Sequence, residues 1–188
     1  DPGAAIAVLR VLPVVRGHGV HGARKLRRQC SQADVPQKGV LPARTFDGVL
    51  MSMAVKVDPP EFRSLCEAFK GGEDSVNYAT LFQFFEGDTQ HDRLDTLRRA
   101  YRKLRTVSGD FVTVDTLLKH WSPQCYPGVE PGSLEEKEAC TEFASQWEVL
   151  RADGHVTPEA FVEYYRDVSI CYEDSVDFIE MVRTAWDL

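Results

Sequence analysis

An apolar pair with its members five residues apart occurs four times along the chain, and this repeat constrains the fold more than any other sequence feature. The pairs are Leu41/Phe46, Val76/Leu81, Val112/Leu117 and Val156/Phe161, and their first members lie 35, 36 and 44 residues apart. After three of the pairs, further apolar residues follow at helical spacing. A fixed period of this length is typical of one supersecondary unit used several times. The sequence therefore predicts four related units, each containing a helix.

The third of these units, Tyr101–Trp121, indicates what each unit contains. Tyr101 and Leu104 end one predicted helix, and Ser108–Asp110 begins a polar loop. A second helix follows, with three apolar residues on one face: Leu117, Leu118 and Trp121. A helix, a loop of about twelve residues and a second helix form the outline of an EF-hand, whose loop binds Ca²⁺ through oxygen ligands. The first member of each apolar pair then falls at the eighth loop position, where neighbouring EF-hand loops pair in a short sheet.

Four such units predict an all-α fold of EF-hand-like helix–loop–helix units in two pairs, with short β pairing between loops and extra helices at both ends of the chain. The polar segment 86–90 is the predicted linker between the pairs. It divides the chain into residues 1–90, an N-terminal pair with a leading helical segment, and residues 91–188, a C-terminal pair with a terminal helix. That terminal helix has a predicted apolar stripe of Val176, Ile179, Val182 and Trp186.

The loops that this register defines lack most of the side chains that hold Ca²⁺. They are Asp34–Thr45, Phe69–Thr80, Arg105–Thr116 and Val149–Ala160. At their first, third, fifth and twelfth positions, carboxylates occur only at Asp34, Glu73 and Asp153. The twelfth position, where a bidentate glutamate is expected, holds threonine or alanine, and Lys38 and Arg105 add positive charge. We therefore predict no metal site, no cofactor and no catalytic residue, and at most weak binding of Ca²⁺.

Composition and charge argue against several other functions. A net charge of −7 without a basic stripe is atypical of a nucleic-acid-binding protein. No run approaches the roughly 18 apolar residues of a membrane span, so no membrane association is predicted. The five cysteines are scattered without a CxxC motif. This pattern is typical of buried thiols in a reducing compartment and predicts a cytoplasmic protein.

The segment Gly17–Gly22 matches the pattern GxGxxG of dinucleotide-binding sites. Such a site needs a strand before the glycines, a helix after them and an acid about 20 residues further on. Asp34 comes too early for that acid, and no βαβ series follows. We therefore interpret the segment as a glycine-rich turn before a basic helix at Ala23–Cys30, with His18 and His21 facing solvent.

An enzymatic function is not predicted. Serine, histidine and cysteine are present, but the sequence indicates no pairing of a nucleophile with a base. His120 is close to Cys125 only along the sequence, and we expect an exposed histidine before a loop cysteine. His155 falls in the turn of the fourth loop and is expected to face solvent.

Several segments resemble the calcyphosin family of four-EF-hand proteins. They are LRVLPVVRG near the amino terminus, AYRKLRTVSGDFVTVDTL in the third unit, and DGHVTPEAFVEYYRDVS and DFIEMVRTAWDL near the end. A loop rich in proline and glycine, SPQCYPGVEPGS, lies where that family has an insertion. The resemblance spans nearly the whole chain and implies an EF-hand fold with a terminal helix. The calcium ligands of the family are largely absent here, so its calcium-signalling role is not implied. Proteins of this kind occur in cilia and flagella, which implies an axonemal setting.

These observations together predict a non-enzymatic, largely Ca²⁺-independent structural or protein-binding module, and the resemblance implies that it is a fixed component of a ciliary or flagellar axoneme. Its partner would be a protein, either a helical segment held in an apolar groove or a microtubule-associated assembly. The alternative is a weak residual Ca²⁺ sensor that uses Asp34 or Asp153. Five aromatic residues on helical stripes belong either to the core or to such a groove: Phe84, Phe85, Tyr164, Tyr165 and Trp186.

Overall fold

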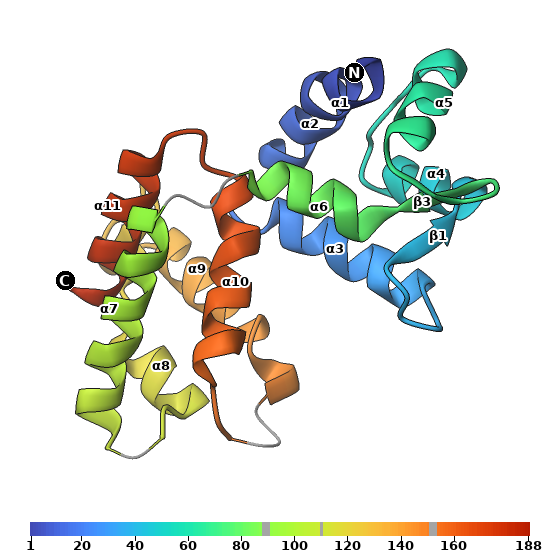
Figure 1. The fold of residues 1–188 in the computed structure, drawn as a ribbon. Coiled ribbons are helices and arrows are strands. Elements are labelled where there is room, and N and C mark those ends of the chain that lie inside the picture. The colour runs from blue at the N-terminus through green and yellow to red at the C-terminus, as the bar shows by residue number, and fades with distance from the viewer. Residues whose placement is uncertain (88–90, 110, 151–153) are drawn as a thin grey trace. The chain divides into compact units, whose positions relative to one another are not determined.

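The computed structural model describes residues 1–87, 91–109, 111–150 and 154–188. Asp110 and Asp153, which the sequence places in the third and fourth loops, lie outside these residues. The described chain is mostly helical with one small three-stranded sheet, which agrees with the predicted all-α class (Figure 1). The chain forms two compact units: unit 1 comprises Asp1–Asp88 with Arg166–Tyr172, and unit 2 comprises Thr89–Tyr165 with Glu173–Leu188.

Unit 1 consists of helices around a short sheet. Its elements in chain order are α1 (Pro2–Ile6), η1 (Ala7–Val11), α2 (Leu12–Gly17), α3 (Gly22–Ala33), β1 (Val40–Pro42), α4 (Ala43–Ser52), α5 (Pro59–Ala68), β2 (Lys70–Gly72), β3 (Ser75–Asn77) and α6 (Tyr78–Glu86). Helix α10 (Pro158–Ile170) begins in unit 2, and its residues from Arg166 onward belong to unit 1. Unit 1 is therefore built from two separate stretches of the sequence.

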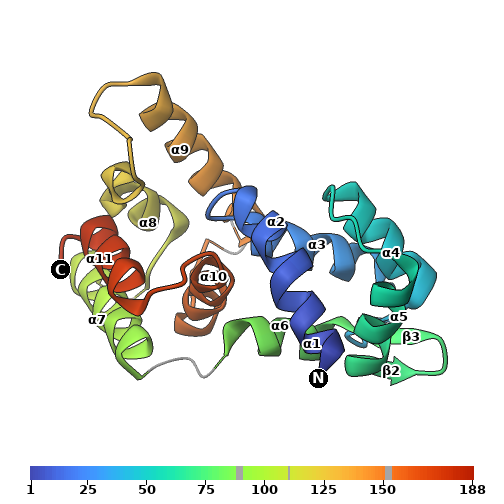
Figure 2. The ribbon, with the colours of Figure 1, turned by 90° about the horizontal axis from the view of Figure 1, so that it is seen from above.

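The leading helical segment, formed by α1, η1 and α2, lies beside α5 in both views (Figures 1 and 2). Helices α1 and α5 approach closely at Gly3 of α1, where an added Cβ atom would lie 2.2 Å from the backbone oxygen of Ser64 in α5. The π-helical turn η1 precedes Pro13, which has no amide hydrogen and so interrupts the helical ladder. Buried alanine and valine side chains of this segment complete the core of unit 1.

The sheet of unit 1 joins the first two loops. Its strand order is β1–β3–β2, with both pairings antiparallel. Leu41 lies opposite Val76, and both side chains are buried. This is the pairing that the repeat predicts for the first members of the first two apolar pairs. Their second members, Phe46 and Leu81, are also buried in the core.

Unit 2 contains the third and fourth apolar pairs. Its elements are α7 (His91–Ser108), α8 (Val114–His120), η2 (Pro123–Cys125), α9 (Leu134–Ser145), η3 (Glu148–Leu150), the first part of α10, and α11 (Ser175–Trp186). The Val156 amide donates a hydrogen bond of 2.8 Å to the Val112 carbonyl. Beside it, Thr113 and His155 form an antiparallel bridge. The third and fourth pairs therefore meet between their loops, as the first two pairs do.

Aromatic side chains fill the core of unit 2. The ring of Phe143 stacks on Trp121 with 4.1 Å between centroids, and further aromatic rings surround it. Tyr164, Tyr165 and Trp186 are buried, so these three aromatic residues belong to the core. The indole nitrogen of Trp186 donates a hydrogen bond of 2.7 Å to the Tyr165 hydroxyl, which fixes α11 on α10.

Two residues lie differently from the sequence-based expectation. His21 is only 5% exposed, whereas we expected it to face solvent. The reason is the tight elbow between α2 and α3, where a Cβ atom on Gly22 would lie 1.8 Å from the Val15 carbonyl oxygen. Val176, predicted to lie on an apolar stripe, is 70% exposed because it lies in the first turn of α11, and the buried face of that helix includes Phe178 instead.

Within the described residues, no single helix is long and apolar enough to cross a membrane. The segments Pro2–Gly17 and Gly22–Ala33, which meet at an angle of 105°, meet the length and composition criteria only as a bent pair.

Candidate functional site

Asp34, the first position of the first loop, is engaged by the protein itself. It follows the last residue of α3, and its side chain is 1% exposed. Its Oδ2 atom accepts hydrogen bonds from the Gly39 amide at 2.7 Å and from the Tyr78 hydroxyl at 2.9 Å. Its Oδ1 atom is buried and has no hydrogen-bond partner within the described part of the chain. The carboxylate thus closes the loop and ties it to the start of α6.

The surroundings of Asp34 keep its carboxyl group ionised. Burial alone would raise its pKa, but the hydrogen bonds from the Tyr78 hydroxyl and the Gly39 amide, together with the nearby amides of Lys38 and Val40, outweigh that effect. The net result is a pKa below the ordinary value. Burial, together with the same hydrogen bond, raises the pKa of Tyr78 to about 12, so the hydroxyl remains a donor at neutral pH.

Acid is therefore expected to destabilise the protein in part through Asp34. Since the folded-state pKa is below the unfolded value of about 3.9, the ionised group stabilises the fold above about pH 4. That stabilisation is lost as the pH falls through the folded-state pKa. Asp34→Asn removes the titration, so the melting temperature of this variant should depend less steeply on pH below about pH 4. Melting curves between about pH 2 and 7 measure this effect. Glu73→Gln is the matched control, because Glu73 is an exposed loop carboxylate. If the melting temperatures of Asp34→Asn and of the native chain fell equally with pH below about pH 4, the assignment would be contradicted.

Most of the other predicted ligand positions of the first two loops lie at the surface. Pro36, Lys38 and Thr45 are exposed, and so is Glu73 in the second loop. Glu73 lies on an open cleft of about 580 Å³. That cleft is lined by three cationic and three acidic side chains beside Phe62 and Cys66: Arg44, Arg63, Lys70, Glu67, Glu73 and Asp74.

The two loops of unit 2 that meet at the Thr113–His155 bridge are also joined by an aromatic contact. Phe111 stacks on the imidazole of His155 with 4.7 Å between ring centroids, and both residues are exposed, as expected for His155. Gly109 has a left-handed backbone with φ of +83°, which ends α7. Among all described residues, no group of three or more histidine, cysteine, aspartate or glutamate side chains could hold a metal ion.

The histidine and cysteine residues considered for catalysis do not form a reactive pair in the described structure. His120 is exposed, and Cys125 is buried. Burial raises the pKa of Cys125 to about 12 and that of Cys30 to about the same value. A thiol with such a pKa stays protonated at neutral pH and is a poor nucleophile.

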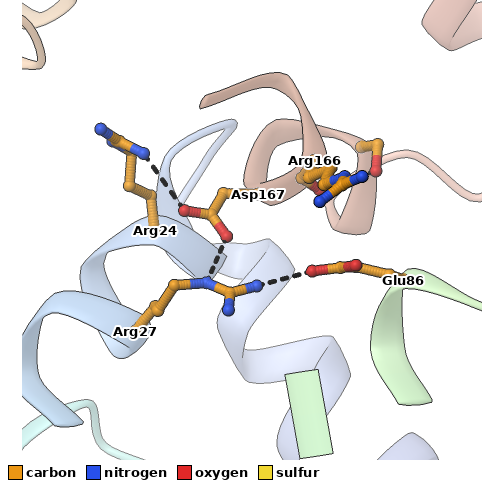
Figure 3. Close-up of polar contacts among 6 residues, drawn as sticks. Arg24, Arg27, Glu86, Arg166 and Asp167 are labelled. Atoms are coloured by element: carbon orange, nitrogen blue, oxygen red, sulfur yellow. Dashed lines mark hydrogen bonds and ion pairs between the residues drawn. The ribbon is translucent and has the colours of Figure 1, made fainter. Parts of the chain in front are cut away.

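A buried ion-pair cluster in unit 1 was not anticipated from the sequence (Figure 3). Asp167, on the last part of α10, is 1% exposed. Its Oδ1 atom lies 2.6 Å from Nε of Arg27, and its Oδ2 atom lies 3.2 Å from Nη1 of Arg24. Arg27 also binds Glu86 at 2.7 Å. Burial raises the pKa of Asp167, and the two arginines act in the opposite direction.

One sequence signal could have indicated this cluster. Arg24 and Arg27 are three residues apart and share a helix face, and Asp167 interrupts an otherwise apolar stripe of α10. An acid on a buried stripe requires a cationic partner. The sequence alone does not show which of the 22 arginines and lysines supplies it.

Comparison with known proteins identifies a distant relative that is similar over most of the chain. No protein-family model matches the chain. The chain is similar to crustacean calcium-binding protein 23 of Faxonius limosus, with 21% identical residues over 170 positions. The aligned region covers 89% of this chain and 84% of that protein. The similarity therefore extends over both units rather than over a single motif.

Proposed function

We propose that this chain is an EF-hand-type protein-binding module, not an enzyme, whose fold does not depend on Ca²⁺. Four helix–loop–helix units would be paired through their loops, residues 1–90 holding one pair and residues 91–188 the other. The contacts of Leu41 with Val76 and of Val112 with Val156 support that assignment. The similarity to a protein named for calcium binding supports the EF-hand class.

The observation that carries independence from Ca²⁺ is the position of Asp34. In this chain its carboxylate satisfies an amide and a hydroxyl, Gly39 and Tyr78, that belong to the protein. The loop is therefore closed by protein groups alone. Lys38 carries a positive charge at the fifth position, and Thr45 cannot supply the bidentate carboxylate that gives EF-hands much of their affinity.

A cleft in unit 2 is the proposed binding surface for a partner. It has a volume of about 430 Å³, lies along α8 and α9, and has an apolar wall that includes Leu118, Trp121 and Phe143. Glu148 is the acidic residue among those that line this cleft; α9 also carries four glutamates outside the lining, Glu135, Glu136, Glu138 and Glu142. An apolar cleft beside acidic side chains fits an amphipathic helix with basic residues.

Calorimetric titration tests the proposed independence from Ca²⁺. The chelator-treated chain is expected to give no heat of binding up to millimolar Ca²⁺, and its melting temperature is expected to be the same in Ca²⁺ and in EGTA. The physical reason is the near absence of ligand carboxylates at the loop positions. A parallel titration with Mg²⁺ controls for non-specific screening of the net charge of −7. A stoichiometric heat with a raised melting temperature would contradict the proposal.

A weak Ca²⁺ sensor is the second candidate, because one observation favours it. The Oδ1 atom of Asp34 is buried without a hydrogen-bond partner within the described residues, as a vacant ligand atom would be. If binding is measured, Asp34→Asn and Asp153→Asn distinguish the first loop from the fourth. Loss of the heat in only one of these variants would assign the site.

The resemblance to calcyphosin leads us to propose a cytoplasmic location and, in ciliated cells, the axoneme. The expected partner there is a helical segment of a microtubule-associated assembly, without nucleic acid or membrane. Imaging of the tagged chain in ciliated cells tests this location. A diffuse signal that detergent extraction removes completely would contradict a fixed axonemal component.

A further inference from the structure

Unit 1 contains a short helix end that comes from a distant part of the sequence. Arg166–Tyr172 belongs to unit 1, although it follows Asp88 by more than 70 residues. Ile170 is buried in the apolar core of unit 1, and Cys171 packs against that core. The segment therefore occupies an apolar slot that residues 1–88 form.

Three arginines of unit 1 bind polar groups of this segment. Arg27 and Arg24 bind the two carboxylate oxygens of Asp167 separately (Figure 3). Arg16 donates a hydrogen bond of 3.0 Å from Nε to the carbonyl oxygen of Ile170, the last residue of α10. The helix end is thus recognised through its acid and through a terminal carbonyl, which carries partial negative charge.

Arg27 is held in place from two further sides. Its second guanidinium nitrogen binds Glu86, and its guanidinium lies 4.2 Å above the ring centroid of the buried Phe82. Helix α6 therefore orients the guanidinium group of Arg27 whether or not the segment with Asp167 is bound. A pre-oriented arginine loses little conformational freedom when it binds a carboxylate.

We propose that Arg16, Arg24 and Arg27, with the apolar slot beside them, form a receptor site for a helix end in which aspartate precedes isoleucine by three residues. The chain's own segment Arg166–Tyr172 fills this receptor site in cis. When the chain's own segment is displaced from the receptor site, a separate peptide with the same sequence is the ligand of that site. This inference concerns unit 1 alone and does not rest on the proposed cleft of unit 2 or on Ca²⁺.

A peptide-binding experiment on the full chain tests the receptor site. The probe is a fluorescently labelled peptide of residues 158–172, and its anisotropy is measured with the native chain and with the Asp167→Arg variant. In the variant the resident segment meets Arg24 and Arg27 with a like charge, so the site is open. We expect the peptide to bind this variant at least about 30-fold more tightly than the native chain. Circular dichroism of the variant must show native helix content.

Matched controls separate recognition from non-specific association. A peptide carrying Asp167→Asn should bind the open variant about 30-fold more weakly. Adding Arg27→Glu to the open variant should abolish binding of the native peptide. If Asp167→Arg does not fold, the same comparison is made with Asp167→Asn in the full chain. Equal binding to the native and variant chains, or no binding to a folded variant, overturns the proposal.

Discussion

Replacing Arg27 with alanine is expected to lower the free energy of unfolding by about 3–5 kcal/mol. The substitution removes the closest partner of Asp167, whose carboxylate is buried and keeps the longer contact to Arg24. A buried charge that loses its partner cannot recover its hydration. Arg27 also covers the face of Phe82, so packing is lost together with charge.

Urea unfolding followed by far-ultraviolet circular dichroism measures this loss. Lys25→Ala is the matched control, because Lys25 is an exposed cation on the same helix. It should change the stability by less than about 0.5 kcal/mol. A loss below about 1 kcal/mol for Arg27→Ala would mean that Asp167 is hydrated in solution and would contradict the buried ion pair.

Phe143→Ala is expected to destabilise unit 2 by about 3–5 kcal/mol. The Phe143 side chain is 0% exposed and stacks on Trp121, with ring centroids 4.1 Å apart. Trp147, Tyr164 and Trp186 lie at centroid distances of 5.9, 5.8 and 6.2 Å. Removing a ring at the centre of such a cluster leaves a cavity that rigid neighbours cannot fill.

Tryptophan fluorescence is a suitable readout for this variant, because all three tryptophans belong to unit 2. Phe111→Ala is the control, because Phe111 is an aromatic residue of the same unit that is 62% exposed and stacks on the exposed ring of His155. Phe111→Ala should lower the free energy of unfolding by less than about 1 kcal/mol. Similar losses for Phe111→Ala and Phe143→Ala would show that the cluster around Phe143 is not closely packed.

The repeat pattern predicted much of the local structure. Because an apolar pair five residues apart marks a loop residue and the helix that follows it, the contact of Leu41 with Val76 could be expected from the sequence alone. The helical class and the terminal helix also follow from apolar spacing. Periodicity identifies which face of a helix is buried, and the existence of these helices depends mainly on that local pattern.

Features that depend on distant partners could not be predicted in the same way. From the sequence, Asp167 is an acid on the buried face of α10, which would be unfavourable without a partner. Its partners, Arg24 and Arg27, come close only in the tertiary fold. The burial of His21 depends on the tight elbow at Gly22, and the pattern GxGxxG does not reveal it. For Asp34, the sequence supplied a candidate ligand, whereas the contact with Tyr78 supplies its structural role.

The division of unit 1 between two stretches of sequence affects how the protein folds during synthesis. Residues 1–88 emerge from the ribosome before the segment Arg166–Tyr172 has been synthesised. At typical elongation rates of 5–20 residues per second, the intervening 80 or so residues take roughly 4–16 s to synthesise. During that interval the slot for Ile170 faces water on the nascent chain. Unit 1 therefore matures only after most of unit 2 has emerged, and the nascent N-terminal half depends on protection from aggregation until then.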